Sequence, residues 1–131
     1  MNKEAYCNYE TSKLLKKQGF NWPCNSRWYQ RTLDGKPEVW YQTVPEDFNR
    51  GDLRNNVSRP THQMAMRWLR EERGIDIIPQ IIELRTKCYR CEISDDVISF
   101  NAGMPNPSYE EAVETAIVAV ATCFDNLPLD E

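Results

Sequence analysis

Apolar residues recur at helical spacing in three stretches of the chain. The first predicts a helix over residues 9–17, and the second predicts one over about residues 59–73. The third opens after Ser108 and is apolar on most of its circumference, which is typical of a buried helix. Each stretch begins beside a residue that favours an N-cap, and the first two end at a glycine. The predicted caps are Asn8, Ser58 and Ser108, and the glycines are Gly19 and Gly74.

Strand-forming residues fill two intervals between these helices. Residues 27–43 predict a β-hairpin, because aromatic and β-branched residues flank Asp34-Gly35, a strong turn signal. A second hairpin is predicted over residues 75–93, where apolar and polar residues alternate. Two further stretches are rich in proline, glycine and asparagine and are predicted as loops. These loops are residues 44–57 and 101–107.

The predicted element order is α-β-β-α-β-β-α. This order favours the α+β class, with two antiparallel hairpins in one sheet and helices packed on a face of it. A length of 131 residues and an apolar content of 40% favour a single domain, residues 1–131, with a buried core. Trp68 lies on the apolar stripe of the second helix and is expected in that core.

Charge is distributed unevenly along the chain. Residues 1–91 carry a net charge of +5, whereas residues 92–131 hold nine acidic residues and neither lysine nor arginine. One interpretation is that the acidic end packs beside the basic part and screens it. The other is that the molecule presents an acidic face to a partner.

The composition indicates a cytoplasmic protein. No apolar run approaches the ~20 residues that span a bilayer, so no membrane association is expected. The first ten residues are polar and lack the apolar core of a secretory signal. Five cysteines, an odd number without regular spacing, indicate reduced thiols.

The residues with reactive side chains form no recognisable catalytic or metal-binding set. Cys88-x-x-Cys91 has the spacing of a zinc or redox pair, but zinc needs four ligands, and a strand would point the two thiols to opposite faces. His62 is the one histidine, and nothing in the sequence brings a partner such as Cys7 or Ser26 near it. We therefore expect no catalytic residues, no metal, no cofactor and no enzymatic activity.

The aromatic residues of the first hairpin are the leading functional candidates. Four large rings lie on one short element, and strand alternation must place some of them on each face. One face can cover the core, and the other then exposes rings of the kind that often mark a protein contact. The predicted partner-binding residues are Trp28, Tyr29, Trp40 and Tyr41.

An arginine-rich stretch supports an alternative, association with nucleic acid. Arginine can contact phosphates, and aromatic rings can stack on bases. A sequence pI near 5.1 opposes non-specific binding of this kind. The residues of this alternative are Arg50, Arg54, Arg59, Arg67 and Arg70.

Residues 58–78 also carry a family resemblance. They contain a Pro-Thr-x-x-x-Ala-x-x-Trp-Leu-Arg-Glu-x-x-Gly-Ile block that resembles small proteins of Bacteroides-type gut bacteria, their phages and mobile elements. That family implies no activity. The resemblance implies a small accessory protein of phage or mobile-element origin, which we expect to bind a protein partner or a second copy of itself.

Overall fold

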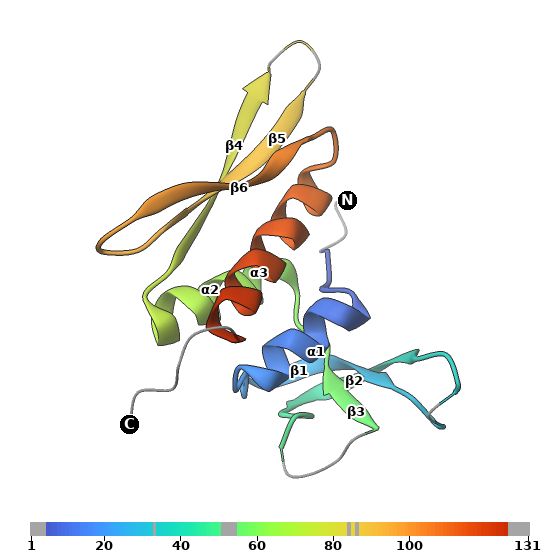
Figure 1. Cartoon of the computed structure of the whole chain (residues 1–131). Helices are drawn as coiled ribbons and strands as arrows, with labels where there is room; N and C mark the ends of the chain where they lie inside the picture. Colours follow the sequence, from blue (N-terminus) through green and yellow to red (C-terminus); the bar gives the residue numbers. More distant parts are fainter. Residues whose placement is uncertain (1–4, 33, 51–54, 84, 86, 126–131) are drawn as a thin grey trace. The chain divides into compact units, whose positions relative to one another are not determined.

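A computed structural model of the chain describes residues 5–32, 34–50, 55–83, 85 and 87–125. The elements follow the order α-β-β-β-α-β-β-β-α (Figure 1). They belong to two units, Met1–Gln63 and Met64–Glu131, each of which is described by itself. The α+β class predicted from the sequence is confirmed, with three helices and two three-stranded antiparallel sheets.

The first unit combines one helix with a sheet of order β2-β1-β3. Helix α1 spans Tyr9–Lys17, and the strands are β1 (Cys24–Tyr29), β2 (Glu38–Glu46) and β3 (Asn56–Ser58). Both pairings of the middle strand β1 are antiparallel. Strand β2 therefore forms one edge of this sheet and β3 forms the other.

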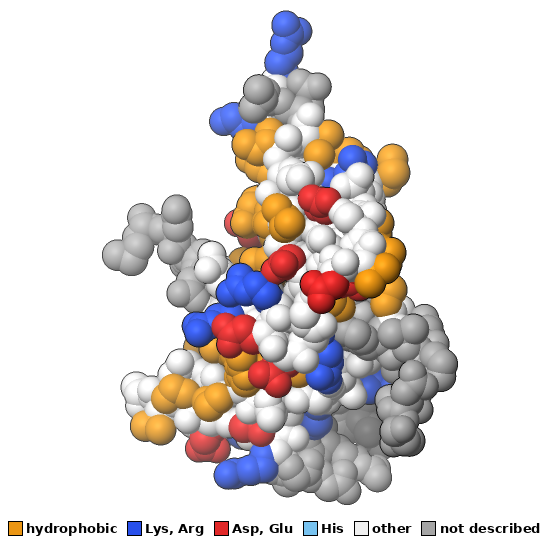
Figure 2. Space-filling model, turned by 90° about the vertical axis from the view of Figure 1, so that its left-hand side faces the viewer, with side chains coloured by type: hydrophobic (Ala, Val, Ile, Leu, Met, Phe, Trp, Pro, Cys, Tyr) orange, Lys and Arg blue, Asp and Glu red, His pale blue; other side chains and the backbone are white. Residues whose placement is uncertain are grey.

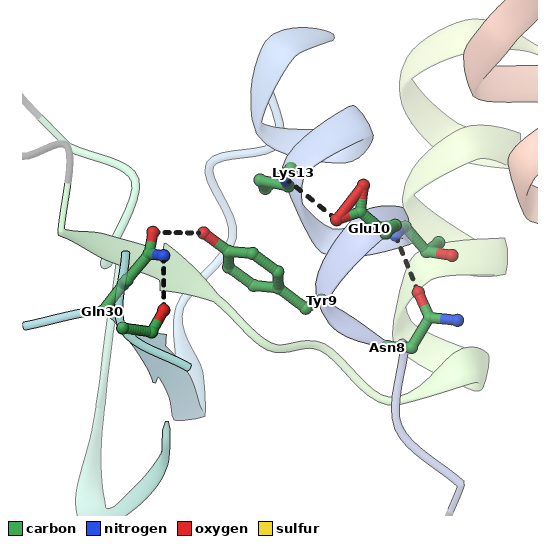
Figure 3. Close-up of polar contacts among 7 residues, drawn as sticks. Asn8, Tyr9, Glu10, Lys13 and Gln30 are labelled. Atoms are coloured by element: carbon green, nitrogen blue, oxygen red, sulfur yellow. Dashed lines mark hydrogen bonds and ion pairs between the residues drawn. The ribbon is translucent and has the colours of Figure 1, made fainter. Parts of the chain in front are cut away.

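Helix α1 has the bounds predicted from the sequence. The Asn8 side chain caps it by accepting a hydrogen bond of 2.8 Å from the Thr11 backbone N–H, and Glu10 pairs with Lys13 at 3.0 Å (Figure 3). Past its end, Gly19 adopts a φ of +96°, which favours glycine. The Tyr9 hydroxyl donates to the side-chain oxygen of Gln30 at 3.0 Å, so the helix is tied to the end of β1 (Figure 3).

The second unit contains a sheet of order β4-β5-β6 covered by a helix. The strands are β4 (Asp76–Glu83), β5 (Cys88–Ser94) and β6 (Ser99–Asn106), and α3 (Tyr109–Asp125) packs against all three (Figure 1). The Ser108 hydroxyl accepts a hydrogen bond of 3.2 Å from the Glu111 N–H, as the predicted cap requires. Small and branched residues of α3 fill the core beneath it: Ala112, Val113, Ala116, Ile117, Val120 and Ala121.

Helix α2 spans His62–Arg73, so it begins with the last two residues of the first unit. Its predicted apolar stripe is partly confirmed, because Ala65, Trp68 and Leu69 are buried. Gly74 follows the helix with a φ of +70°, the left-handed conformation expected of a glycine stop. Among the described residues, no helix is both long and apolar enough to cross a membrane.

The predictions of one sheet and of two loops were wrong. Residues 56–58 form β3 and residues 99–106 form β6, so each hairpin gains a third strand and becomes a separate sheet. Neither strand has a clear alternating pattern of its own, because each is held by pairing to a middle strand. The turn before β6 is fixed by Asp95, whose carboxylate accepts the N–H groups of Val97 and Ile98 at 2.8 Å each.

The predicted start of the second helix was also wrong. The Ser58 hydroxyl accepts a hydrogen bond of 3.0 Å from the Phe48 N–H instead of capping a helix. The chain stays extended through Thr61, which forms a bridge with Tyr6, and the Pro60 carbonyl accepts the Cys7 N–H at 2.9 Å. This contact between residues far apart in sequence delays the helix to His62, which the local pattern could not show.

The two predicted hairpins exist, and they differ from the prediction in detail. Residues 30–37 separate β1 from β2, and the chain turns at Asp34-Gly35 as predicted, since the Gly35 N–H donates to the Thr32 carbonyl at 3.1 Å. Gly35 is not among the residues with positive φ, so the left-handed glycine that an Asp-Gly hairpin turn favours is absent at this position. The Gly35 carbonyl instead accepts a hydrogen bond of 2.7 Å from the Gln30 side chain. In the second hairpin, β4 continues through Pro79, which is tolerated because β4 is an edge strand.

The burial of Trp68 leads to a stability prediction. Its side chain is 2% exposed, so Trp68→Ala should lower the free energy of unfolding by about 3–5 kcal/mol. The exposed Arg70 of the same helix provides a control, because Arg70→Ala should change that free energy by no more than about 0.5 kcal/mol. Urea unfolding followed by circular dichroism measures both. Equal stability of the Trp68 variant and the parent would contradict the predicted role.

Candidate protein-binding surface

The four aromatic residues of the first hairpin differ in exposure. Trp28 and Tyr29, on the middle strand β1, are half-buried. Trp40 and Tyr41, on the edge strand β2, are 44% and 64% exposed. The structure therefore divides the predicted set into two inner rings, which contribute to packing, and two outer rings, which face solvent.

Strand pairing assigns these rings to two faces of the sheet. Ser26 pairs with Tyr41 and Trp28 pairs with Val39, so all four side chains lie on one face. This face meets α1, because the Trp28 indole N–H donates to the Ser12 hydroxyl at 3.2 Å. The opposite face carries Arg27 with its pair Trp40, and Tyr29, whose ring meets the Trp40 ring edge-on at 6.0 Å.

The α1-facing side of the sheet holds an arginine surrounded by aromatic rings. The Arg59 guanidinium carbon lies 4.1 Å from the ring centre of Tyr6, 5.2 Å from that of Trp28 and 5.5 Å from that of Tyr41. Its Nη1 donates to the Tyr41 hydroxyl at 2.9 Å and to the Ser26 hydroxyl at 3.2 Å. Arg59 is half-buried, and its Nε has no hydrogen-bond partner among the described residues.

The opposite side of the sheet repeats this arrangement around Arg27. The Arg27 guanidinium carbon lies 5.4 Å from the ring centre of Phe48, 5.5 Å from that of Trp40 and 5.7 Å from that of Tyr29. Its Nη1 donates to the Asn56 side-chain oxygen at 2.9 Å. Cation–π contacts thus stabilise an arginine on each face of the hairpin, and each contact contributes about 0.5–2 kcal/mol.

The outer edge of β2 also presents backbone groups. On the β3 side of β1, the Ser26 carbonyl accepts a hydrogen bond from the Arg59 N–H, and the Gln30 N–H donates one to the Asn55 carbonyl. The even-numbered residues along β1 therefore direct their backbone groups toward β3. Arg27 therefore turns toward β2 and pairs with Trp40. By the same alternation, the backbone groups of the residues on either side of Trp40 face outward. These residues are Val39 and Tyr41, and no described strand pairs with them there.

The residues of the nucleic-acid alternative are distributed over both units. Arg50 is exposed in the first unit, where Arg59 forms the aromatic cluster, and Arg54 lies outside the described residues. In the second unit, Arg67 and Arg70 are exposed on α2. Arg67 pairs with Glu71 at 2.6 Å, and this hydrogen bond raises the Arg67 pKa.

The Cys88-x-x-Cys91 motif lies on β5, where a spacing of three residues points the two side chains to opposite faces. Cys91 is fully buried, and burial raises its pKa to about 11. Cys24 on β1 is also buried, and burial is the main reason that its pKa rises to about 12. Both buried thiols are therefore protonated at neutral pH, which makes them poor nucleophiles and poor metal ligands.

Sequence reasoning missed the proximity of Cys7 and His62. The Cys7 sulfur and a ring nitrogen of His62 lie within 4.8 Å of each other, and both side chains are buried. The antiparallel bridge between Tyr6 and Thr61 brings the two segments together. The sequence carries no signal for this bridge. Two ligands from one part of the chain do not by themselves define a metal site.

Sequence reasoning also missed exposed apolar residues in the second unit. Val97 and Met104 are 87% and 84% exposed, and Ile81 and Ile98 are also open to solvent. Figure 2 shows apolar side chains at the surface of the part that contains this sheet. These residues lie on the edge strands β4 and β6 and on the turn that precedes β6. Their exposure does not by itself indicate a partner.

No protein-family model matches this sequence, and comparison with curated proteins and with solved structures finds no significant match.

The buried thiols lead to a prediction about stability at alkaline pH. An unfolded thiol ionises near its ordinary pKa of 9.0, whereas Cys91 in the folded chain ionises near 11. The unfolded state therefore releases protons first, and the contribution of Cys91 to stability is complete below pH 9 and is lost as the pH rises through about 11. Urea unfolding at a series of pH values should show stability falling over this range.

Other groups also titrate at alkaline pH, so variants isolate the contribution of the buried thiol. In Cys91→Ala the fall between pH 9 and 11 should be shallower than in the parent. Cys123 is an exposed cysteine of the same unit, and Cys123→Ser should leave the slope unchanged. Identical slopes in the parent and in Cys91→Ala would contradict the prediction.

Proposed function

We propose that this chain is a small, non-enzymatic accessory protein that binds a protein partner through the outer edge of β2. The supporting observation is that outward backbone groups and exposed apolar side chains coincide on one edge strand. Val39, Trp40, Tyr41 and Val44 are all exposed there. An edge strand of this kind accepts an added strand, whose main-chain hydrogen bonds supply affinity while side-chain contacts supply specificity.

Proteins usually protect an exposed edge strand against pairing with other chains, and β2 has such protection only near its ends. It has a proline near one end, Pro45, and a glutamate at each end, Glu38 and Glu46. Its middle section lacks charge, and the most exposed aromatic rings of the unit lie there. A protein that uses an edge for binding has to keep such a section open, whereas a merely structural edge gains from a lysine or an inward-pointing charge.

Association with nucleic acid is the second proposal and has weaker support. The net charge of −4 opposes general attraction to phosphate, and Arg67 is already paired with Glu71. The partner of the first proposal is another protein or a second copy of this chain. We also propose an origin in a phage or mobile element, on the resemblance of residues 58–78 described above.

Replacing the outer rings tests the proposed function. The double variant Trp40→Ser/Tyr41→Ser should lose self-association in sedimentation velocity, or capture of a partner from the native host, while its far-ultraviolet circular dichroism stays that of the parent. Val97→Ser is a matched control, because it removes an exposed apolar side chain from the other unit. Loss of binding in the control as well would indicate non-specific association through exposed apolar side chains and would contradict the proposal.

A second variant pair tests the backbone of the edge. Val39→Pro removes an outward N–H group at a position where proline is tolerated, and it should abolish the same association. Val39→Thr keeps the N–H and the β-branched shape, and it should retain most of the binding. If Val39→Pro binds like the parent, strand addition at this edge is wrong, even if the rings matter.

A further inference from the structure

The arginine on each face of the hairpin has a positive charge that no acidic residue among those described balances. Arg59 and Arg27 contact rings, hydroxyl groups and an amide, and no described carboxylate lies within 4.0 Å of either guanidinium. By comparison, Arg67 on the exposed face of α2 does have a carboxylate partner. Half-buried charges are normally paired, because burial without a partner costs free energy.

Some N–H groups of the Arg59 guanidinium have no hydrogen-bond acceptor among the described residues. Arginine has five N–H groups, and the bonds of Arg59 to described residues come from Nη1 alone. Its Nε is buried and unpartnered, and its Nη2 forms no such bond. The Tyr41 hydroxyl, which accepts from Nη1 at 2.9 Å, anchors the cation beside the open edge. A carboxylate arriving at this edge can therefore accept a hydrogen bond from Nη2, which, unlike Nε, is not among the buried unpartnered atoms.

Pairing of β2 with β2 of a second copy conflicts with these charges. A two-fold axis perpendicular to the sheet joins two copies edge to edge and leaves the corresponding faces of the two sheets on the same side. An axis at Tyr41 places the two Arg59 side chains on the same face, one on each side of the new pair. An axis at Trp40 does the same for the two Arg27 side chains. In both arrangements like charges face each other across the added strand.

A symmetric arrangement that brings the ends of two β2 strands together meets another repulsion, because β2 carries a glutamate at each end. Like charges directly opposite each other destabilise a sheet. A partner strand whose acidic side chain lies over the uncharged middle section of β2, away from Glu38 and Glu46, and that has no basic residue avoids both repulsions and can neutralise Arg59. We infer that the partner segment at β2 is an extended, acidic strand of a different protein, with a carboxylate at Arg59.

This inference rests on the proposed function, so the test separates the two. The probes are three fluorescent peptides in which valine alternates with glutamate, glutamine or lysine, and binding is measured by fluorescence anisotropy. The glutamate peptide should bind the full chain at least about tenfold more tightly than the glutamine peptide, and the lysine peptide should bind most weakly. Val39→Pro should abolish binding of all three.

Variants assign the preference to Arg59. Arg59→Gln should bring the affinities of the glutamate and glutamine peptides within about twofold of each other. Tyr41→Phe removes only the hydroxyl that positions the guanidinium, and it should reduce the preference in part. The matched control is Arg50→Gln, which removes an exposed charge from the same unit and should leave the preference intact.

A salt titration of the parent needs no variant. The preference for glutamate should shrink between about 0.05 M and about 0.5 M salt, while binding of the glutamine peptide persists. Equal affinity for the glutamate and glutamine peptides would overturn the acidic specificity and leave edge binding in place. Failure of all three peptides to bind would overturn both. Displacement of the glutamate peptide by an oligothymidylate, lost in Arg59→Gln, would assign the site to nucleic acid and also overturn the inference.

Discussion

The strand in the middle of each sheet sets the organisation of its unit. Strand β1 is paired on both sides, as is β5, so neither can shift or expose its backbone without breaking two sets of hydrogen bonds. Because side chains alternate strictly along a paired strand, the position of every side chain on β1 is fixed relative to α1. Ser26 and Trp28 must face the helix, and Arg27 and Tyr29 must face away. The two arginine clusters follow from this alternation.

The same constraint underlies the proposal that the outer edge of β2 binds a partner. All backbone groups of β1 are directed to its neighbours, whereas β2 has a neighbour on one side only. The rings on β1 are held by contacts from both faces and cannot be removed without loss of packing. The rings on β2 also contact the unit, Trp40 at Tyr29 and Tyr41 at Tyr6, but they are 44% and 64% exposed, so much of their surface is open to solvent.

The sequence predicted an element correctly where contacts between residues close in sequence determine that element. Helix α1 was predicted with its bounds, because Asn8, Glu10, Lys17 and Gly19 act within one or two turns of their own positions. Strands β3 and β6 were missed, because pairing to a middle strand holds them and their own residues form no clear pattern. The start of α2 was misplaced for the same reason, since a bridge to Tyr6 keeps Thr61 extended.

The candidate surface was predictable in part by the same rule. The sequence identified the four aromatic residues and required that they divide between two faces, which the register confirms. It could not show which rings are exposed, because that depends on β3 being the other neighbour of β1. It grouped Arg59 with other arginines by nearness in sequence, whereas the folded chain places Arg59 across the sheet among Tyr6, Trp28 and Tyr41. A cation held by rings keeps its full charge, since a ring attracts a cation without neutralising it. The contacts of Arg59 with described residues therefore leave its charge unpaired beside an open edge, and this is the ground on which we propose an acidic partner strand.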